Sequence, residues 1–168
     1  MTDPWIVVNT PQVFSDAEIH EIEKLVLQGG EVDTRNLTEN LRNAYRIGVV
    51  YTGGLMVGVG VIKRLGTHHD TVVRCSGFLD PGGFSAEIGY FYIDPSRRQK
   101  GLAGSLFELL MRSYPDPVYA TTRQDNEAMQ HILEKGGFSR VGQPWGSRQS
   151  PGRTIHLWVG PRRAGPPK

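Results

Sequence analysis

The sequence predicts a mixed α/β (α+β) domain in which helices flank a central sheet that contains a parallel strand pair. Three observations lead to this fold class. Apolar runs of strand length and amphipathic helical segments follow one another in the order β-α-α-β-β-β-α-β-α-β-β. Thr52-Gly53-Gly54 separates two of the apolar runs, which predicts a hairpin. A strand-helix-strand unit over residues 87–122 requires a right-handed crossover and therefore a parallel pair.

The first part of the chain is predicted to form two helices and three strands. Ser15-Asp16-Ala17-Glu18 is a capping box, in which the Ser and Glu side chains satisfy free N–H groups, so a helix is expected to begin there. Apolar residues then recur at helical spacing until Gly29-Gly30 ends the helix. A shorter helix is expected over residues 35–43. The expected strands cover residues 5–8, 45–51 and 55–62.

The second part is predicted to contain two further helices. The first covers residues 101–113, with an apolar stripe formed by Leu102, Leu106, Leu109 and Leu110. Residues 68–70 are expected in a polar loop, residues 71–75 in a short strand, and residues 76–85 in a flexible loop. The remaining expected elements are strands over residues 87–93, 117–122, 138–141 and 154–159 and a helix over residues 127–135.

Size and composition favour one domain over residues 1–160, followed by a flexible basic tail over residues 161–168. No apolar run approaches the roughly 20 residues that span a membrane, and the first residues lack the basic and apolar pattern of a signal peptide. Cys75 is the single cysteine, which excludes an internal disulfide, and it is expected to be packed rather than catalytic. We therefore expect a cytoplasmic protein without a membrane partner.

Charge is distributed unevenly along the chain. Residues 1–43 carry eight acidic and three basic residues, whereas residues 44–168 carry sixteen basic and nine acidic ones. A basic second part fits an anionic cofactor or partner. The basic residues are scattered, so nucleic acid is not the expected partner, although the composition leaves it open. His68-His69-Asp70 lacks the paired spacing of metal ligands, and no metal site is expected.

The most informative stretch runs from Ala86 to Met111. It reads as an apolar strand, a basic turn and an amphipathic helix. The first turn of a helix presents backbone N–H groups that have no partner within the helix, at the positive end of its dipole. Gly101 and Gly104 permit close approach of a ligand, and Arg97, Arg98 and Lys100 add positive charge. The pattern predicts a site for a phosphate-bearing ligand.

Two motifs in this region carry a family resemblance. Arg98-Gln99-Lys100-Gly101-Leu102-Ala103 fits the pattern Arg/Gln-x-x-Gly-x-Gly/Ala and resembles the pyrophosphate loop of the GNAT superfamily of N-acyltransferases. The segment Asn126 to Phe138 is similar to the GNAT segment in which an Asn opens the last helix and Glu-Lys-x-Gly-Phe ends it. The resemblance implies a central mixed, mostly antiparallel sheet with a splayed parallel strand pair.

The resemblance also implies that acetyl-CoA (coenzyme A) is the cofactor. Backbone groups of Tyr92 and Ile93 would bind the pantetheine arm as an added strand does. The pyrophosphate would be held by Arg98, Gln99, Lys100, Gly101, Ala103 and Gly104. Asn126 would contact the pantetheine through its amide, or cap the helix, or do both. Homodimers are common in the superfamily, and a homodimer is left open here.

The implied chemistry is direct attack of an amine on the thioester. Because an alkylamine with a pKa near ~10 is protonated at neutral pH, a base must remove a proton. Glu87 lies eleven residues before Arg98, the spacing of the general-base glutamate in GNAT histone acetyltransferases; the alternatives are a solvated acid or a direct ligand of a cationic substrate. Burial would raise its pKa toward a useful range. Leu133 stands where many members carry the Tyr that protonates the leaving thiolate, so Tyr90, Tyr92 or a water is expected to replace it.

The acceptor is expected beside the end of the strand over residues 117–122. Thr122 and Arg123 lie there, and Trp145 follows in a segment that often shapes the acceptor pocket in the family. The leading interpretation is an N-acetyltransferase acting on a primary amine, either a small molecule or a protein lysine or N-terminus. Two alternatives stay open: acetylation of aminoacyl-tRNA, as in GNAT-type toxins, and a non-catalytic acyl-CoA-binding module.

Overall fold

The computed structural model describes residues 3–30, 32–78 and 83–161, and these fall into two compact units. The first unit comprises residues 1–64 and 88–114, and the second comprises residues 65–87 and 115–168. Each unit is described by itself. The sequence predicts one domain over residues 1–160, which stays a prediction, and residues 162–168 of the predicted tail lie outside the described residues.

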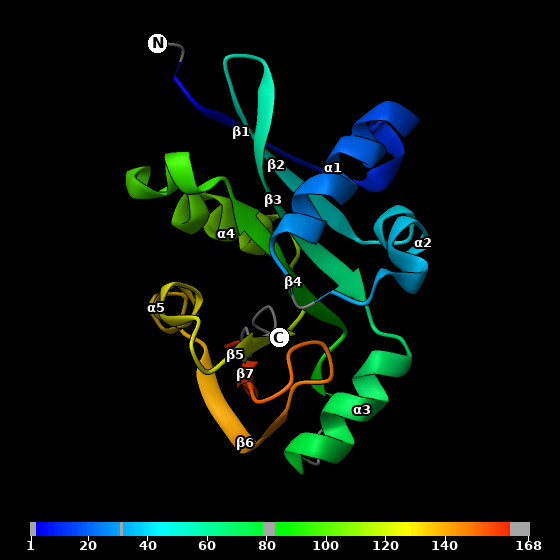
Figure 1. Cartoon of the computed structure of the whole chain (residues 1–168), viewed down its shortest axis with the longest axis vertical. Helices are drawn as coiled ribbons and strands as arrows, with labels where there is room; N and C mark the ends of the chain where they lie inside the picture. The colour runs from blue at the N-terminus through cyan, green and yellow to red at the C-terminus, as the bar shows by residue number, and fades with distance from the viewer. Residues whose placement is uncertain (1–2, 31, 79–82, 162–168) are drawn as a thin grey trace, which may run out of the picture. The chain divides into compact units, whose positions relative to one another are not determined.

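The predicted fold class is confirmed. In the first unit the strand order is β1 (Trp5–Asn9), β2 (Arg46–Thr52), β3 (Leu55–Arg64) and β4 (Ala86–Ile93). In the second unit the start of β4 pairs in parallel with β5 (Val118–Arg123), and β5 is followed by β7 (Thr154–Val159) and β6 (Ser139–Gly146), both antiparallel to their neighbours. The described residues thus form a seven-stranded, mostly antiparallel sheet with one parallel pair (Figure 1).

The first unit contains the helices α1 (Asp16–Gln28), α2 (Leu37–Arg42) and α4 (Leu102–Ser113). The predicted capping box is confirmed, because the backbone N–H of Glu18 donates to Ser15 Oγ and the N–H of Ser15 donates to Glu18 Oε2. The hairpin is also confirmed, with Thr52 opposite Leu55. Leu109, predicted in the apolar stripe of α4, is 38% exposed, and Phe107 is buried instead. The helix therefore turns a slightly different face to the core than the leucine spacing alone suggests.

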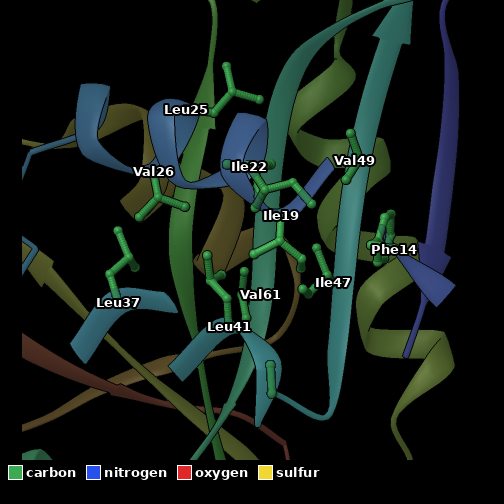
Figure 2. Close-up of a cluster of buried hydrophobic side chains, with 12 residues drawn as sticks. Phe14, Ile19, Ile22, Leu25, Val26, Leu37, Leu41, Ile47, Val49 and Val61 are labelled. Carbon is green, nitrogen blue, oxygen red and sulfur yellow. The ribbon is translucent and has the colours of Figure 1, made fainter. Parts of the chain in front are cut away.

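Two faces of β2 and β3 serve two sets of helices. Figure 2 shows side chains of α1 and α2 pointing toward Ile47 and Val49 of β2 and Val61 of β3. The intervening positions face α4, and here Gly48 lies opposite Gly60. A Cβ atom at Gly48 would come within 2.5 Å of Leu106, and one at Gly60 within 2.8 Å of Phe91. The glycines let Leu106 of α4 and Phe91 of β4 lie close against β2 and β3.

The second unit contains a helix that the sequence analysis missed. Residues 68–70 were expected in a loop and residues 71–75 in a strand, but both predictions are wrong, because α3 covers Thr67–Ser76. The β-branched run at 71–73 favours a strand by propensity. Val72 is nevertheless buried at helical spacing against the sheet, and Gly77 ends the helix in the left-handed conformation, φ 66°. Tertiary packing overrides the local preference here.

The other boundary that differs is that of β6. The segment from Pro144 to Gly146 was expected between the last two strands, but it lies within β6. The register of β6 against β7 shifts between Val141 and Trp145, so the strand continues beyond an irregularity that hides it in the sequence. A proline is compatible with this position because β6 is the last strand in the order. The other helix of the unit, α5 (Glu127–Lys135), lies where it was predicted.

Candidate functional site

The basic turn of the first unit is shaped by its own backbone. After β4, Asp94 Oδ1 accepts hydrogen bonds from the backbone N–H and the hydroxyl of Ser96, at 2.8 and 2.6 Å, and these bonds lower the pKa of the Asp94 carboxyl. The chain then forms the 3-10 helix η4 (Pro95–Lys100) and reaches Gly101, whose φ of 68° favours glycine. The carbonyl of Gly101 accepts a helical hydrogen bond from the N–H of Ser105. The N–H groups of α4 that come before Ser105 therefore belong to the first turn, which has no acceptors within the helix.

The residues of this turn fit a pyrophosphate. A Cβ atom built at Gly101 or Gly104 would meet no atom within 4 Å, so the backbone there is open to a ligand. Arg98 Nε donates to the Ile93 carbonyl at 2.8 Å, and its guanidinium lies 5.7 Å from the ring centre of Tyr92. Ala103 lies half-buried in the first turn of α4. The side chains of Gln99 and Lys100 lie outside the described residues.

The strand before the turn carries three further predicted residues. Ile93 is buried, and the N–H of the following Asp94 donates to the Val57 carbonyl at 2.7 Å. Tyr92 packs partly buried against the core of the first unit. Tyr90 has a φ of 54°, in the left-handed region that non-glycine residues rarely adopt. Lys63 Nζ lies 4.4 Å from the centre of the Tyr90 ring.

Glu87 belongs to the second unit and is the buried carboxylate of the site. It lies opposite Tyr119 in the parallel pair of β4 and β5, and only 8% of its side chain is exposed. Thr121 Oγ1 donates to Glu87 Oε1 at 3.2 Å, and His68 Nε2 of α3 lies 4.0 Å from the same oxygen. The structure thus joins an acid, a hydroxyl and an imidazole from three different elements.

Tyr119, which lies opposite Glu87, packs among apolar side chains. Burial and, to a smaller extent, the charge of Glu87 raise the pKa of Tyr119, so its hydroxyl stays protonated. The Tyr119 hydroxyl lies 3.2 Å from His69 Nδ1. A cavity of about 10 Å³, room for about one water molecule, lies against His69, Tyr119 and the neighbouring apolar side chains Val72, Phe84 and Leu157.

Asn126 caps α5. Its Oδ1 accepts a hydrogen bond from the backbone N–H of Met129 at 3.1 Å, which is the capping role that the sequence left open. This bond uses the carbonyl oxygen of the amide and does not involve its two N–H donors. Leu133, where many family members carry a tyrosine, has no exposed surface and packs in the core.

The three predicted acceptor residues divide between two faces of the second unit's sheet. Alternate residues of a strand share a face. Thr121 and Arg123 therefore lie on the same side as Glu87, together with Trp145, which aligns with Arg123 through Ile155. Thr122 lies on the opposite face, where its Oγ1 accepts a hydrogen bond from Trp158 Nε1 at 2.9 Å and it is 5% exposed.

His68, next to Glu87, was missed as a functional residue because it was expected in a polar loop. Thr121 lies at the end of the strand expected over residues 117–122, beside which the acceptor was expected, but its hydrogen bond to Glu87 was not predicted. The signal for His68 was present: His69, Val72, Val73 and Ser76 follow at intervals of three and four, which is a helical period. Such a helix brings its first residues back to the sheet, beside the strand that carries Glu87.

In residues 3–30, 32–78 and 83–161, no group of three or more His, Cys, Asp or Glu side chains could hold a metal ion. No helix within the same ranges is long and apolar enough to cross a membrane.

Comparison with known proteins identifies the fold and the family. The model of the acetyltransferase (GNAT) family matches residues 16–138. Among solved structures, ElaA of Escherichia coli aligns with a TM-score of 0.68 at 12% identity, covering 93% of this chain and 99% of that one. FeeM, an N-acyl amino acid synthase from uncultured soil microbes, aligns with a TM-score of 0.67 at 17% identity, covering 94% and 92%. NAA60 of Arabidopsis thaliana, solved with a bisubstrate analogue, aligns with a TM-score of 0.64 at 13% identity, covering 92% of this chain and 97% of that one. No curated protein matches the sequence.

Proposed function

Because this chain belongs to the acetyltransferase (GNAT) family, we propose that it transfers an acetyl group from acetyl-CoA to a primary amine. The observation that carries the proposal is the buried Glu87, held by Thr121 on the strand that leads into the basic turn. A buried carboxylate is expensive to keep without a role, and catalytic bases are found in such environments.

Acetyl-CoA is the proposed acyl donor, and when bound it supplies a thioester carbonyl activated for attack. Its pyrophosphate would be held by the open backbone at Gly101, Ala103 and Gly104 and by the side chains of Arg98, Gln99 and Lys100. Backbone groups of Tyr92 and Ile93 would bind the pantetheine arm, and the amide N–H groups of Asn126, which the helix cap does not use, would donate to it.

Glu87 is the proposed general base. An acceptor amine arrives protonated at neutral pH and must lose a proton before its nitrogen can attack. The N–H bond breaks, the proton passes to a carboxylate oxygen of Glu87, and the nitrogen lone pair becomes available for the new N–C bond. Tyr90 is the proposed proton donor to the leaving thiolate, in place of the tyrosine that Leu133 replaces.

The proposed acceptor site uses Arg123 and Trp145 on the face of the sheet that carries Glu87. Thr122 lies on the opposite face of the same sheet, so its proposed contribution is to support this strand end. Arg123 Nε lies 3.2 Å from Asp125 Oδ1, so its guanidinium is held at the strand end. An aromatic ring and a fixed cation suit an amine that also bears apolar and anionic groups. FeeM is named an N-acyl amino acid synthase, and an amino acid combines such groups with an amine.

The first experiment is thermal unfolding with and without acetyl-CoA, with CoA, ATP and NAD as controls. At a hundredfold excess over its Kd, a ligand stabilises the folded state by about 2.7 kcal/mol, which corresponds to a rise in Tm of roughly 5–11 °C at this size. A rise with acetyl-CoA or CoA, but not with ATP or NAD, supports the cofactor. No rise at millimolar acetyl-CoA contradicts it.

Turnover is then measured by release of free thiol in the presence of single primary amines, beginning with amino acids and peptides with free N-termini. Acetylation of at least one amine is expected. Binding of acetyl-CoA without turnover of any amine would favour an acyl-CoA-binding module instead.

A further inference from the structure

A second proton-accepting group lies beside the buried carboxylate of the second unit. His68 Nε2 is 4.0 Å from Glu87 Oε1, and the two side chains differ sharply in exposure, with 59% of His68 and 8% of Glu87 reaching the surface. The pair therefore connects a buried oxygen to solvent through one imidazole ring.

The position of His68 is fixed by the helix that carries it. Its neighbour His69 contacts the Tyr119 hydroxyl through Nδ1 at 3.2 Å and lies against the Tyr119 ring with a centroid distance of 5.5 Å. Val72, one turn further on, is 1% exposed in the apolar cluster of the unit. These contacts anchor the first turn of α3 on β5, and they leave His68 directed at Glu87.

A buried base must lose the proton that it has taken before it can act again. His68 from α3 and Tyr119 from β5 are two titratable groups near Glu87. The Tyr119 hydroxyl is already protonated, and the Thr121 hydroxyl donates its hydrogen to Glu87. Imidazole, in contrast, can accept a proton at one nitrogen and release one from the other.

We propose that His68 is the proton exit of Glu87, a residue that acts through the general base rather than on the substrate. The inference rests on the proposed function. In the proposed step, the O–H bond of protonated Glu87 breaks and its hydrogen binds His68 Nε2, while the hydrogen on Nδ1 leaves to water. Glu87 returns to the carboxylate and His68 to the neutral ring. Rotation of the exposed His68 side chain closes the distance from 4.0 Å to the roughly 2.7–3.2 Å of a hydrogen bond.

The test is chemical rescue of His68→Gln. With acetyl-CoA and amine saturating, at pH 7.5 and low buffer concentration, kcat is expected to fall about tenfold, because water relays the proton less well than imidazole. Added imidazole is expected to restore kcat, and the KM values are expected to stay unchanged. A kcat equal to that of the wild type overturns the proposal. A loss of kcat that imidazole does not restore also overturns it, since that is what a structural role predicts.

The chain offers a matched control in His20 of α1. His20 Nδ1 lies 3.7 Å from Glu23 Oε2, and 67% of the His20 side chain is exposed. His20→Gln therefore removes an imidazole with the same kind of partner and similar exposure. Its kcat is expected to equal that of the wild type, with or without imidazole. An equal loss in both variants would contradict a specific role of His68.

Glu87→Gln separates this inference from the function on which it rests. Loss of kcat in Glu87→Gln without response to imidazole, together with rescue in His68→Gln, supports both. Full activity of Glu87→Gln refutes Glu87 as the general base, and the proton exit that depends on that base is then refuted as well. Loss in Glu87→Gln with unchanged activity in His68→Gln refutes the proton exit alone.

Discussion

Two clusters in this molecule contain the same three side-chain types in similar geometry. In the first unit, Thr38 Oγ1 donates to Glu23 Oε1 at 2.5 Å, and His20 lies 3.7 Å from the other carboxylate oxygen. In the second unit, Thr121 donates to Glu87 at 3.2 Å, and His68 lies 4.0 Å away. A survey of side-chain types alone would not tell them apart.

Their settings differ. His20 and Glu23 are one helical turn apart on α1. Thr38 of α2 donates a hydrogen bond to Glu23, so this cluster connects two neighbouring helices. Glu87 lies on β4 and takes its partners from β5 and α3, and less than half as much of its side chain is exposed. Burial and placement on the sheet, rather than the set of side-chain types, therefore mark Glu87 as the candidate base.

The largest expected effect comes from Glu87→Gln. Removing a general base typically lowers the rate by about 10²–10⁴-fold, and the amide keeps the shape of the side chain and an acceptor for Thr121. The rise in Tm with acetyl-CoA is expected to match that of the wild type. Steady-state kinetics and thermal unfolding measure the two quantities separately.

Glu23→Gln is the control, because it changes the carboxylate of the cluster on the surface helices. It is expected to leave kcat unchanged and to cost about 0.5–1.5 kcal/mol of stability, because only a hydrogen bond between helices is weakened. Equal losses of kcat and of acetyl-CoA binding in Glu87→Gln would instead assign Glu87 a structural role.

The next largest effect is expected at the basic turn, where binding depends on open backbone. Gly101→Leu fills the space that the ligand would occupy, and the Kd for acetyl-CoA is expected to rise at least thirtyfold, by about 2 kcal/mol or more. Gly30 has the same φ of 68° and the same open surroundings, so Gly30→Leu carries the same backbone strain. Titration by calorimetry should show a wild-type Kd for Gly30→Leu. A similar loss in both variants would mean that strain, and not blockage, explains the result.

A smaller effect separates the two roles of Asn126. Asn126→Asp keeps the helix cap but removes the amide donors. The free energy of unfolding is therefore expected to stay unchanged, whereas the affinity for acetyl-CoA is expected to fall a few-fold. Asn126→Ala loses the cap as well and is expected to cost about 1 kcal/mol of stability. Urea denaturation and calorimetry measure both. Unchanged affinity in both variants would leave Asn126 with the cap alone.

The smallest effect concerns acid stability, which must be distinguished from acid effects on kcat. Burial, and secondarily the charge of Arg140, lower the pKa of His156 in the folded state. Its proton therefore favours the unfolded chain, so the stability is complete above about pH 6.5 and declines as the pH falls below it. Urea denaturation at pH 7.5 and 5.5 is expected to show a loss that His156→Val reduces by about 1 kcal/mol or less. Identical losses in both proteins would assign the acid sensitivity to other groups.

Local sequence patterns were sufficient to predict several structural elements of this protein. The capping box at Ser15, the hairpin at Thr52 and the turn that ends at Gly101 were predicted because each depends on residues close together in the sequence. The motifs at Arg98 and Asn126 gave the family for the same reason, since both are contiguous. The residues proposed to hold the cofactor lie in or next to these two motifs, and their role stays a prediction.

The surroundings of Glu87, in contrast, depend on contacts between residues that are distant in the sequence. Residues 71–73 read as a strand until Val72 is seen packed against the sheet, and without α3 there is no imidazole beside the carboxylate. The separation of Thr122 from Arg123 likewise depends on the register of β5 against β4 and β7. Burial and pairing between residues distant in the chain are collective properties of packing. A sequence can therefore indicate a carboxylate as a candidate base, whereas the fold determines whether that carboxylate is buried and which side chains lie beside it.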